Sequence, residues 1–91
     1  MFKIKIFGKV QGVSYRVWLK KTAESMSIDG YVCNNKDGSV DALVTCNKNE
    51  LKKLISLCYK GPKLSKVSKI EYCYLSDNFS KNILKGFFIK Y

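Results

Sequence analysis

The stretch FGKVQGVSYR, residues 7 to 16, has the residue types of an anion-binding loop. Gly8 and Gly12 let the backbone bend, so that successive N–H groups can face one small ligand with no side chain in the way. Arg16 is the first charged residue after Gly12, and its forked guanidinium can hold two oxygens of one phosphate. The same pattern is also compatible with an ordinary glycine turn beside a solvated arginine.

Two asparagines, Asn34 and Asn35, form a second candidate group. A neutral amide can hold and orient a water molecule, and a positioned arginine can stabilise the charge of a phosphoryl group in transfer. Arg16, a cradle of backbone N–H groups and Asn34 would therefore make a minimal hydrolytic site. An asparagine at a strand end is also a common turn residue that bonds its own backbone, and spacing alone leaves both interpretations open.

The residues that are missing limit the chemistry. The chain has no histidine, so a Ser-His or Cys-His nucleophile pair and the usual neutral-pH base are absent. The four cysteines (Cys33, Cys46, Cys58 and Cys73) form no CxxC pair and lie among apolar neighbours, which favours small buried thiols in a reducing compartment over disulfides or metal ligands. Any catalysis must then depend on positioning and electrostatics.

Charge and length narrow the class of protein further. Seventeen Lys plus Arg against seven Asp plus Glu give a net charge of +10, which attracts phosphates, nucleic acids or acidic proteins. The lysines are scattered singly or in pairs, so the charge alone is weak evidence for a nucleic-acid site. Ninety-one residues predict one domain over 1–91, and without a membrane-length apolar run or a signal-like start we expect a cytoplasmic monomer.

Apolar periodicity predicts the elements that must position these residues. A strand over 2–7 precedes a loop over 8–13, and a helix capped by Ser14 runs from Tyr15 to about residue 27. Strands over 28–35 and 39–46 follow, joined by a tight hairpin at 37–38. A helix with an Asn47–Glu50 capping box ends at 61–62, and strands over 66–75 and 86–91 flank a polar segment over 76–85.

This order predicts where the candidate residues meet. The order βαββαβ with a short extra strand indicates a two-layer α+β fold, with two helices on one face of an antiparallel sheet. The loop, the N-terminus of the first helix and the end of the second strand then share one end of the molecule. If the third strand lies between the first two, Asn34 lies two strand spacings from Arg16, about 10 Å away.

GKVQGVSYR at 8–16 together with GYVCNNKDGSVDA at 30–42 closely resembles the acylphosphatase family, and GPKLSKV at 61–67 and the terminal GFFIKY extend the resemblance over nearly the whole chain. The resemblance implies a ferredoxin-like fold and hydrolysis of carboxyl-phosphate anhydrides without metal or organic cofactor. It implies that Arg16 and loop amides bind the phosphoryl group and that Asn34 orients the water. The implied cradle comprises Lys9, Val10, Gln11, Gly12, Val13, Ser14 and Tyr15.

Three positions depart from the family pattern. Tyr15 stands where phenylalanine is common, and its added hydroxyl should be tolerated if it reaches water or a partner. Cys33 stands where a long side chain is frequent, and Cys46 stands where a glycine often closes the third strand. These departures bear on substrate preference and stability more than on activity.

Two other functions compete with the enzyme. An RNA-binding module of this topology would need aromatic and basic side chains on its central strands, but the facing positions of the third strand are Ser39, Asp41, Leu43 and Thr45. The other is a non-catalytic domain that binds acyl phosphates, like the related domain at the start of large hydrogenase-maturation carbamoyltransferases. The length of the chain and its initial methionine favour the free-standing enzyme.

Overall fold

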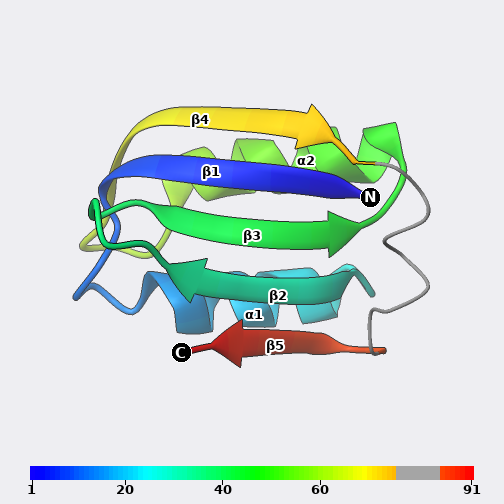
Figure 1. The fold of residues 1–91 in the computed structure, drawn as a ribbon, viewed down its shortest axis with the longest axis horizontal. Helices are drawn as coiled ribbons and strands as arrows, with labels where there is room; N and C mark the ends of the chain where they lie inside the picture. Colours follow the sequence, from blue (N-terminus) through cyan, green and yellow to red (C-terminus); the bar gives the residue numbers. More distant parts are fainter. Residues whose placement is uncertain (76–84) are drawn as a thin grey trace.

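The computed structural model describes residues 1–75 and 85–91 and confirms the predicted two-layer α+β architecture (Figure 1). One five-stranded sheet has the order β4-β1-β3-β2-β5, and both helices lie on the same face of it. The polar segment predicted at 76–85 falls outside the described residues except for Lys85. The elements are β1 (Phe2–Lys9), α1 (Tyr15–Ser25), β2 (Asp29–Asn34), β3 (Val40–Thr45), α2 (Lys48–Lys60), β4 (Lys66–Tyr74) and β5 (Phe87–Lys90).

The strand pairing confirms that the third strand lies between the first two. β3 pairs antiparallel with β1 on one side and with β2 on the other. β4 pairs antiparallel with the outer side of β1, and β5 pairs parallel with β2. β1 and β2 therefore point the same way and finish at the same end of the sheet.

The core lies between the sheet and the helices, as the alternation predicted. Side chains of β1 and β3 that face the helices are buried, and their neighbours face away from the helices. α1 contributes Leu19 and Ala23, and α2 contributes Leu51 and Leu54. The helix-covered face is thus the apolar face, and the charged face of the sheet is open.

β1 is longer than predicted, because Gly8 and Lys9 belong to the strand rather than to the loop. Gly8 pairs with Val67 and Lys9 with Lys66, after a register shift between Phe7 and Gly8. A Cβ on Gly8 would lie 2.1 Å from the carbonyl oxygen of Lys66, so only glycine allows β4 to approach this closely. The loop itself therefore covers residues 10 to 14.

The two helix starts differ from each other. Asn47 and Glu50 form the predicted capping box, in which the Glu50 amide donates to Asn47 Oδ1 at 2.8 Å and the Asn47 amide donates to Glu50 Oε1 at 3.0 Å. Ser14 occupies the cap position of α1 but has left-handed backbone angles, and its side chain makes no capping bond. The prediction of a Ser14 cap was therefore wrong in its chemistry, although α1 does begin at Tyr15.

The prediction of four buried thiols was wrong for most of them. All four cysteines are free, but only Cys58 is buried, Cys33 and Cys46 are half-buried, and Cys73 is exposed. Cys73 lies on β4, an edge strand of which few side chains are buried, and apolar neighbours in sequence could not indicate that.

Among the described residues, neither helix has the length and apolar character that a membrane span requires.

Candidate functional site

The candidate residues meet at one end of the molecule, as the topology predicted. Figure 1 shows the end of β1, the start of α1 and the arrowhead of β2 on the same side, with the end of β5 beside them. Arg16 lies in the first turn of α1, and Asn34 is the last residue of β2. By strand alternation Asn34 shares a face with buried Val32, which is the face that α1 covers.

The loop over residues 10–14 is anchored by buried side chains at intervals. Val10, Val13 and Tyr15 are buried, whereas Gly12 and Ser14 between them are exposed. The apolar residues thus fix the path of the loop against the core. The positions between them leave backbone open to solvent.

The backbone of this loop contains two residues with left-handed φ angles. Gly12 and Ser14 have φ of 74° and 64°, in the left-handed region, and such residues turn successive N–H groups toward one point. Ser14 adopts this conformation without the freedom of glycine, at a cost of about 1–2 kcal/mol. Within residues 1–75 and 85–91, the backbone amides of residues 11–14 donate to no acceptor. These donors are free for a ligand.

The first turn of α1 adds further donors and Arg16. The Trp18 amide makes the first helical bond, to the Ser14 carbonyl at 3.1 Å, so the N–H groups before it lack intrahelical partners. Half-buried Arg16 has no acidic partner among the described residues, and its guanidinium lies 4.9 Å from the ring centre of Tyr91. A cation at this helix end opposes the helix dipole, and an anion between the two would resolve the conflict.

The structure separates the two asparagines. Asn35 is the turn residue: its side-chain amide donates to Ser39 Oγ at 2.9 Å, and its backbone amide donates to the Ser39 carbonyl at 2.9 Å. Exposed Asn34 makes no side-chain hydrogen bond to any described residue. Its amide is therefore available to a water or a ligand.

Polar bonds fix the hairpin that follows Asn34. Asp37 Oδ1 accepts from the Ser39 amide at 2.9 Å and from Ser39 Oγ at 2.5 Å, and Asp37 forms an ion pair with Lys5 at 3.2 Å. The bond from the Ser39 hydroxyl, followed by the Ser39 amide and Lys5, lowers the pKa of Asp37 to about 2. Only Gly38 of the predicted Asp37–Gly38 turn has a left-handed backbone; Asp37 acts through its carboxylate instead.

Two contacts at this end were missed from sequence. The Gln11 side chain, expected only to lend its backbone, bonds the hairpin at two carbonyls. The Arg16 guanidinium lies over the ring of Tyr91. A lone glutamine in an apolar loop and an aromatic residue far along the chain carry no pairing signal, so sequence patterns could not have assigned either contact.

The Tyr15 hydroxyl reaches a partner, as the departure from phenylalanine required. It donates to the carbonyl of Cys58 in the last turn of α2 at 2.6 Å. That carbonyl would normally accept from residue 62, which is a proline and has no N–H. Burial raises the pKa of Tyr15 far above its usual value, so the hydroxyl stays protonated and keeps donating.

We expect Tyr15→Phe to lower the free energy of unfolding by about 1–3 kcal/mol, because it leaves the buried Cys58 carbonyl without a donor. The free energy of unfolding is measured by urea denaturation, with circular dichroism as the signal. Tyr72→Phe is the control, since it removes an exposed hydroxyl with no recorded bond among the described residues. Equal losses in the two variants would contradict the role of the bond.

Three of the four thiols are poor nucleophiles. Burial, followed by the charge of Asp41, raises the pKa of Cys33, while Lys90, Lys3 and Arg16 oppose the rise. Burial also raises the pKa of Cys46 to about 11 and that of Cys58 to about 12. These three thiols stay protonated at neutral pH. The charge of Arg16 also acts on the residue next to Asn34.

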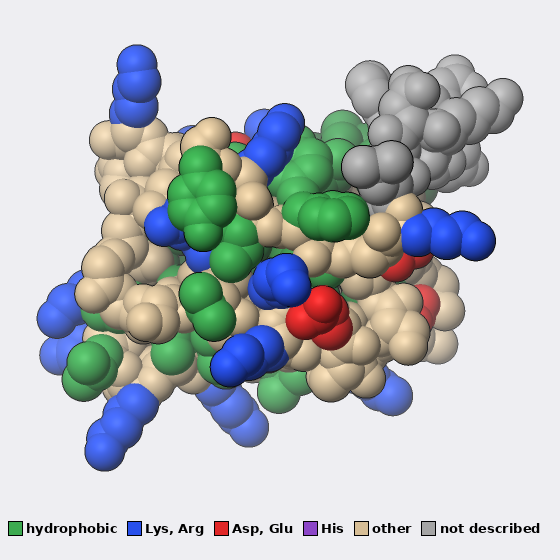
Figure 2. Space-filling view, turned by 90° about the horizontal axis from the view of Figure 1, so that it is seen from below, with side chains coloured by type: hydrophobic (Ala, Val, Ile, Leu, Met, Phe, Trp, Pro, Cys, Tyr) green, Lys and Arg blue, Asp and Glu red, His purple; other side chains and the backbone are tan. Residues whose placement is uncertain are grey.

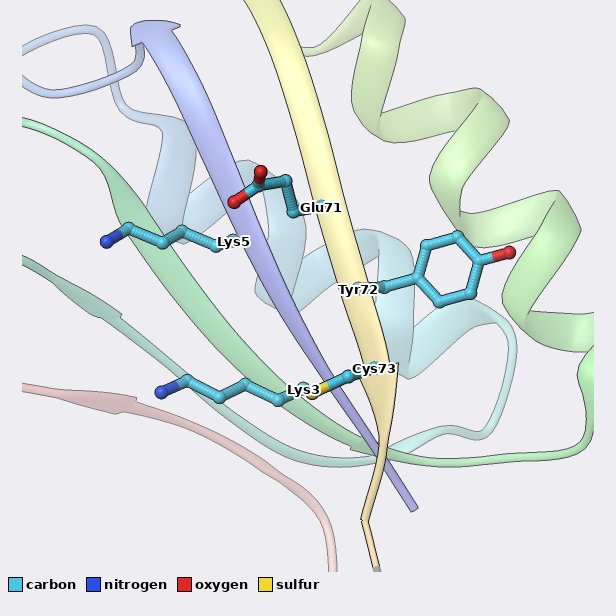
Figure 3. Close-up of a pocket in the computed structure, with 5 residues that line it drawn as sticks. All are labelled: Lys3, Lys5, Glu71, Tyr72 and Cys73. Atoms are coloured by element: carbon cyan, nitrogen blue, oxygen red, sulfur yellow. The ribbon is translucent and has the colours of Figure 1, made fainter.

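A shallow hollow on the open face of the sheet does not compete with this site. In Figure 3 the Lys3 and Lys5 side chains extend away from β4, whereas Tyr72 points toward α2, so the lining groups do not converge. Lys3 and Lys5 are also engaged by Asp41 and Asp37. The hollow is lined by Lys3, Lys5, Glu71, Tyr72 and Cys73.

On the face seen from the β5 side, the positive charge is dispersed (Figure 2). Figure 2, seen from the β5 side, shows Lys and Arg side chains spread singly with few acids between them. Four lysines lie at the same end of the sheet as the candidate site, and none of them has an ion-pair partner among the described residues. They are Lys9, Lys36, Lys60 and Lys63.

The family model and the relatives found by comparison with known sequences carry the same description. The Acylphosphatase family model matches residues 2–89. An acylphosphatase of Rhodopseudomonas palustris (strain ATCC BAA-98 / CGA009) is 40% identical over 68 residues, which cover 75% of this chain and 69% of that protein. An acylphosphatase of Nitrobacter winogradskyi is 34% identical over 84 residues, covering 92% of this chain and 85% of that protein.

Solved structures agree with the sequence match. The crystal structure of acylphosphatase from Bacillus subtilis superposes with a TM-score of 0.86 at 28% identity, covering 99% of this chain and 97% of that one. Full-length HypF, in its phosphate- and nucleotide-bound form, gives a TM-score of 0.82 at 28% identity over 98% of this chain. Only 11% of the HypF chain is covered.

Proposed function

Because the chain belongs to the acylphosphatase family, we propose that it hydrolyses the carboxyl-phosphate bond of small acyl phosphates by in-line attack of a water that Asn34 positions. The products are a carboxylate and inorganic phosphate. The observation that supports this most is that the loop with unbonded backbone amides, the first turn of α1 with Arg16 and the end of β2 with Asn34 all lie at one end of the sheet.

The phosphoryl group sits in the loop. Backbone amides of Val10 to Tyr15, chiefly those of residues 11–14, donate to its oxygens, and the Arg16 guanidinium binds two of them. Lys9, which the sequence placed in the cradle, belongs to β1 and pairs with Lys66 instead. The loop donors are fixed before the substrate arrives, because Val10, Val13 and Tyr15 anchor the loop in the core. Fixed donors stabilise the charge that spreads over the equatorial oxygens in the transition state.

The water attacks from the hairpin side. Asn34 holds it through its amide, in line with the bond to the acyl oxygen. The water oxygen forms a bond to phosphorus, the bond from phosphorus to the acyl oxygen breaks, and its electron pair leaves with the carboxylate. The protons of the water end on the phosphate product or in solvent.

The leaving group explains why little acid catalysis is needed. A carboxylate is stable at neutral pH, so protonating it adds little to the rate. This agrees with a chain that has no histidine and with three thiols whose pKa values lie above neutrality. The proposed rate enhancement comes from positioning and electrostatic stabilisation.

We further propose that residues 1–91 act as one cytoplasmic domain and as a monomer that binds no nucleic acid. Free thiols at all four cysteines agree with a reducing compartment. On the open face, Lys3 and Lys5 pair with acids, which leaves less charge for a phosphate backbone. The unpaired lysines at the site would instead attract an anionic substrate.

The wild-type protein should hydrolyse a synthetic acyl phosphate, and a metal chelator should leave the rate unchanged. Release of inorganic phosphate, corrected for spontaneous hydrolysis, measures this. A protein that binds phosphate without turnover would contradict the enzyme and favour the accessory domain. Salt-sensitive RNA binding without turnover would favour the RNA-binding module.

A further inference from the structure

The side chain of Gln11 connects two segments that the proposed mechanism needs in register. Its Nε2 donates to the carbonyl of Asn35 at 2.7 Å and to the carbonyl of Ser39 at 2.9 Å. Both hydrogens of the amide are thus used, and both acceptors belong to the hairpin between β2 and β3. Gln11 itself belongs to the loop of residues 10–14.

The acceptors lie on the part of the hairpin that determines where Asn34 points. Asn35 follows Asn34 directly, and Ser39 is bonded to Asn35 through backbone and side chain. Ser39 is only 2% exposed, and Asp37 holds it through two bonds. The hairpin is therefore rigid by itself, and Gln11 joins it to the loop.

We propose that Gln11 is a positioning residue, which rests on the proposed function: its amide sets the distance between the phosphate-binding loop and the water held by Asn34. Gln11 touches neither the reacting phosphorus nor the water through this amide, because both of its hydrogens are engaged. It acts through Asn34. An error of about 1 Å in the placement of a reacting group can lower a rate by about 100-fold.

Gln11→Met tests this, because methionine has a similar length and no donors. We expect kcat to fall by about 10- to 100-fold, while the inhibition constant of inorganic phosphate changes by less than about 3-fold, because the loop donors and Arg16 remain. Gln11→Glu should lose at least as much, since its oxygens would face two carbonyls. Thr22→Val is the matched control: it removes a half-buried bond to the Trp18 carbonyl that joins no two segments, and kcat should not change.

A double-variant cycle shows whether Gln11 acts through Asn34. In an Asn34→Ala background, Gln11→Met should lower kcat by less than about 2-fold more, because the water is no longer positioned. If Gln11→Met lowers kcat by the same factor in the Asn34→Ala background as in wild type, the proposal is wrong. A rise in the phosphate inhibition constant as large as the fall in kcat would also overturn it.

A measurement without turnover separates this proposal from the proposed function. In ¹⁵N-labelled wild type, the Gln11 side-chain amide hydrogens should exchange slowly with solvent. Gln11→Met should accelerate hydrogen exchange of the backbone amide of Asn35. If the protein hydrolyses no acyl phosphate but these exchange rates are as expected, the proposed hydrolase activity is wrong, whereas the connection between Gln11 and the hairpin is supported. Freely exchanging Gln11 side-chain hydrogens would overturn the connection itself.

Discussion

Replacing Arg16 by alanine should lower kcat/KM for an acyl phosphate by about 1,000-fold and raise the inhibition constant of inorganic phosphate at least about 10-fold. The half-buried guanidinium has no acidic partner among the described residues, so its charge and donors are free for the phosphoryl group. The ground state and the transition state should both lose stabilisation. Steady-state kinetics with phosphate as competitive inhibitor measure both effects.

The control for this variant is Lys21→Ala. Lys21 is an exposed cation on the same helix, so this variant loses the same charge away from the loop. It should retain activity within about 2-fold, because exposed charges at a distance are screened by salt. Arg16→Lys should recover only part of the loss, since an ammonium lacks the planar fork. A fully active lysine variant would contradict two-point binding by Arg16.

Replacing Asn34 by alanine should lower kcat by at least about 100-fold and leave phosphate inhibition nearly unchanged. The Asn34 amide bonds no described residue, so its removal breaks no internal contact and the fold should persist. The variant loses the group that orients the attacking water. That group stabilises the transition state but does not contribute to binding of the phosphate product. The measurement is kcat under saturating substrate, with circular dichroism to verify folding.

Asn49→Ala is the matched control for Asn34→Ala. Asn49 is also exposed, but it lies in the first turn of α2. Its replacement removes an asparagine amide away from the candidate site and should leave kcat unchanged. An Asn34→Ala protein with wild-type kcat would remove Asn34 from the mechanism and leave the origin of the water to another group.

Much of the fold could be predicted because its signals are local. Alternation in β1, the stripe Tyr15, Leu19 and Ala23, and the capping box at Asn47 all follow from spacings within one element. Their order then restricts the topology to few choices. Two errors arose where a distant strand decides: β4 extends β1 through Gly8, and the edge position of β4 leaves Cys73 exposed. The Ser14 cap failed for a local reason, because its backbone is left-handed and its side chain makes no capping bond.

In the candidate site, too, local features could be predicted and long-range contacts could not. Arg16 and Asn34 were predicted because residue type and topology place them at one end, and the family resemblance supplied their roles. The contacts that tune the site could not be predicted. The bonds from Gln11 to the hairpin and from Tyr15 to Cys58 join residues far apart in sequence, and nothing local specifies which carbonyl lacks a donor.

The central claim is a division of labour, in which the loop with Arg16 holds the phosphoryl group and Asn34 supplies only the aimed water. The most direct test compares phosphate inhibition constants of wild type, Arg16→Ala and Asn34→Ala under identical conditions. The account predicts a constant that rises at least about 10-fold for Arg16→Ala and stays within about 3-fold of wild type for Asn34→Ala. Equal shifts in the two variants would contradict it.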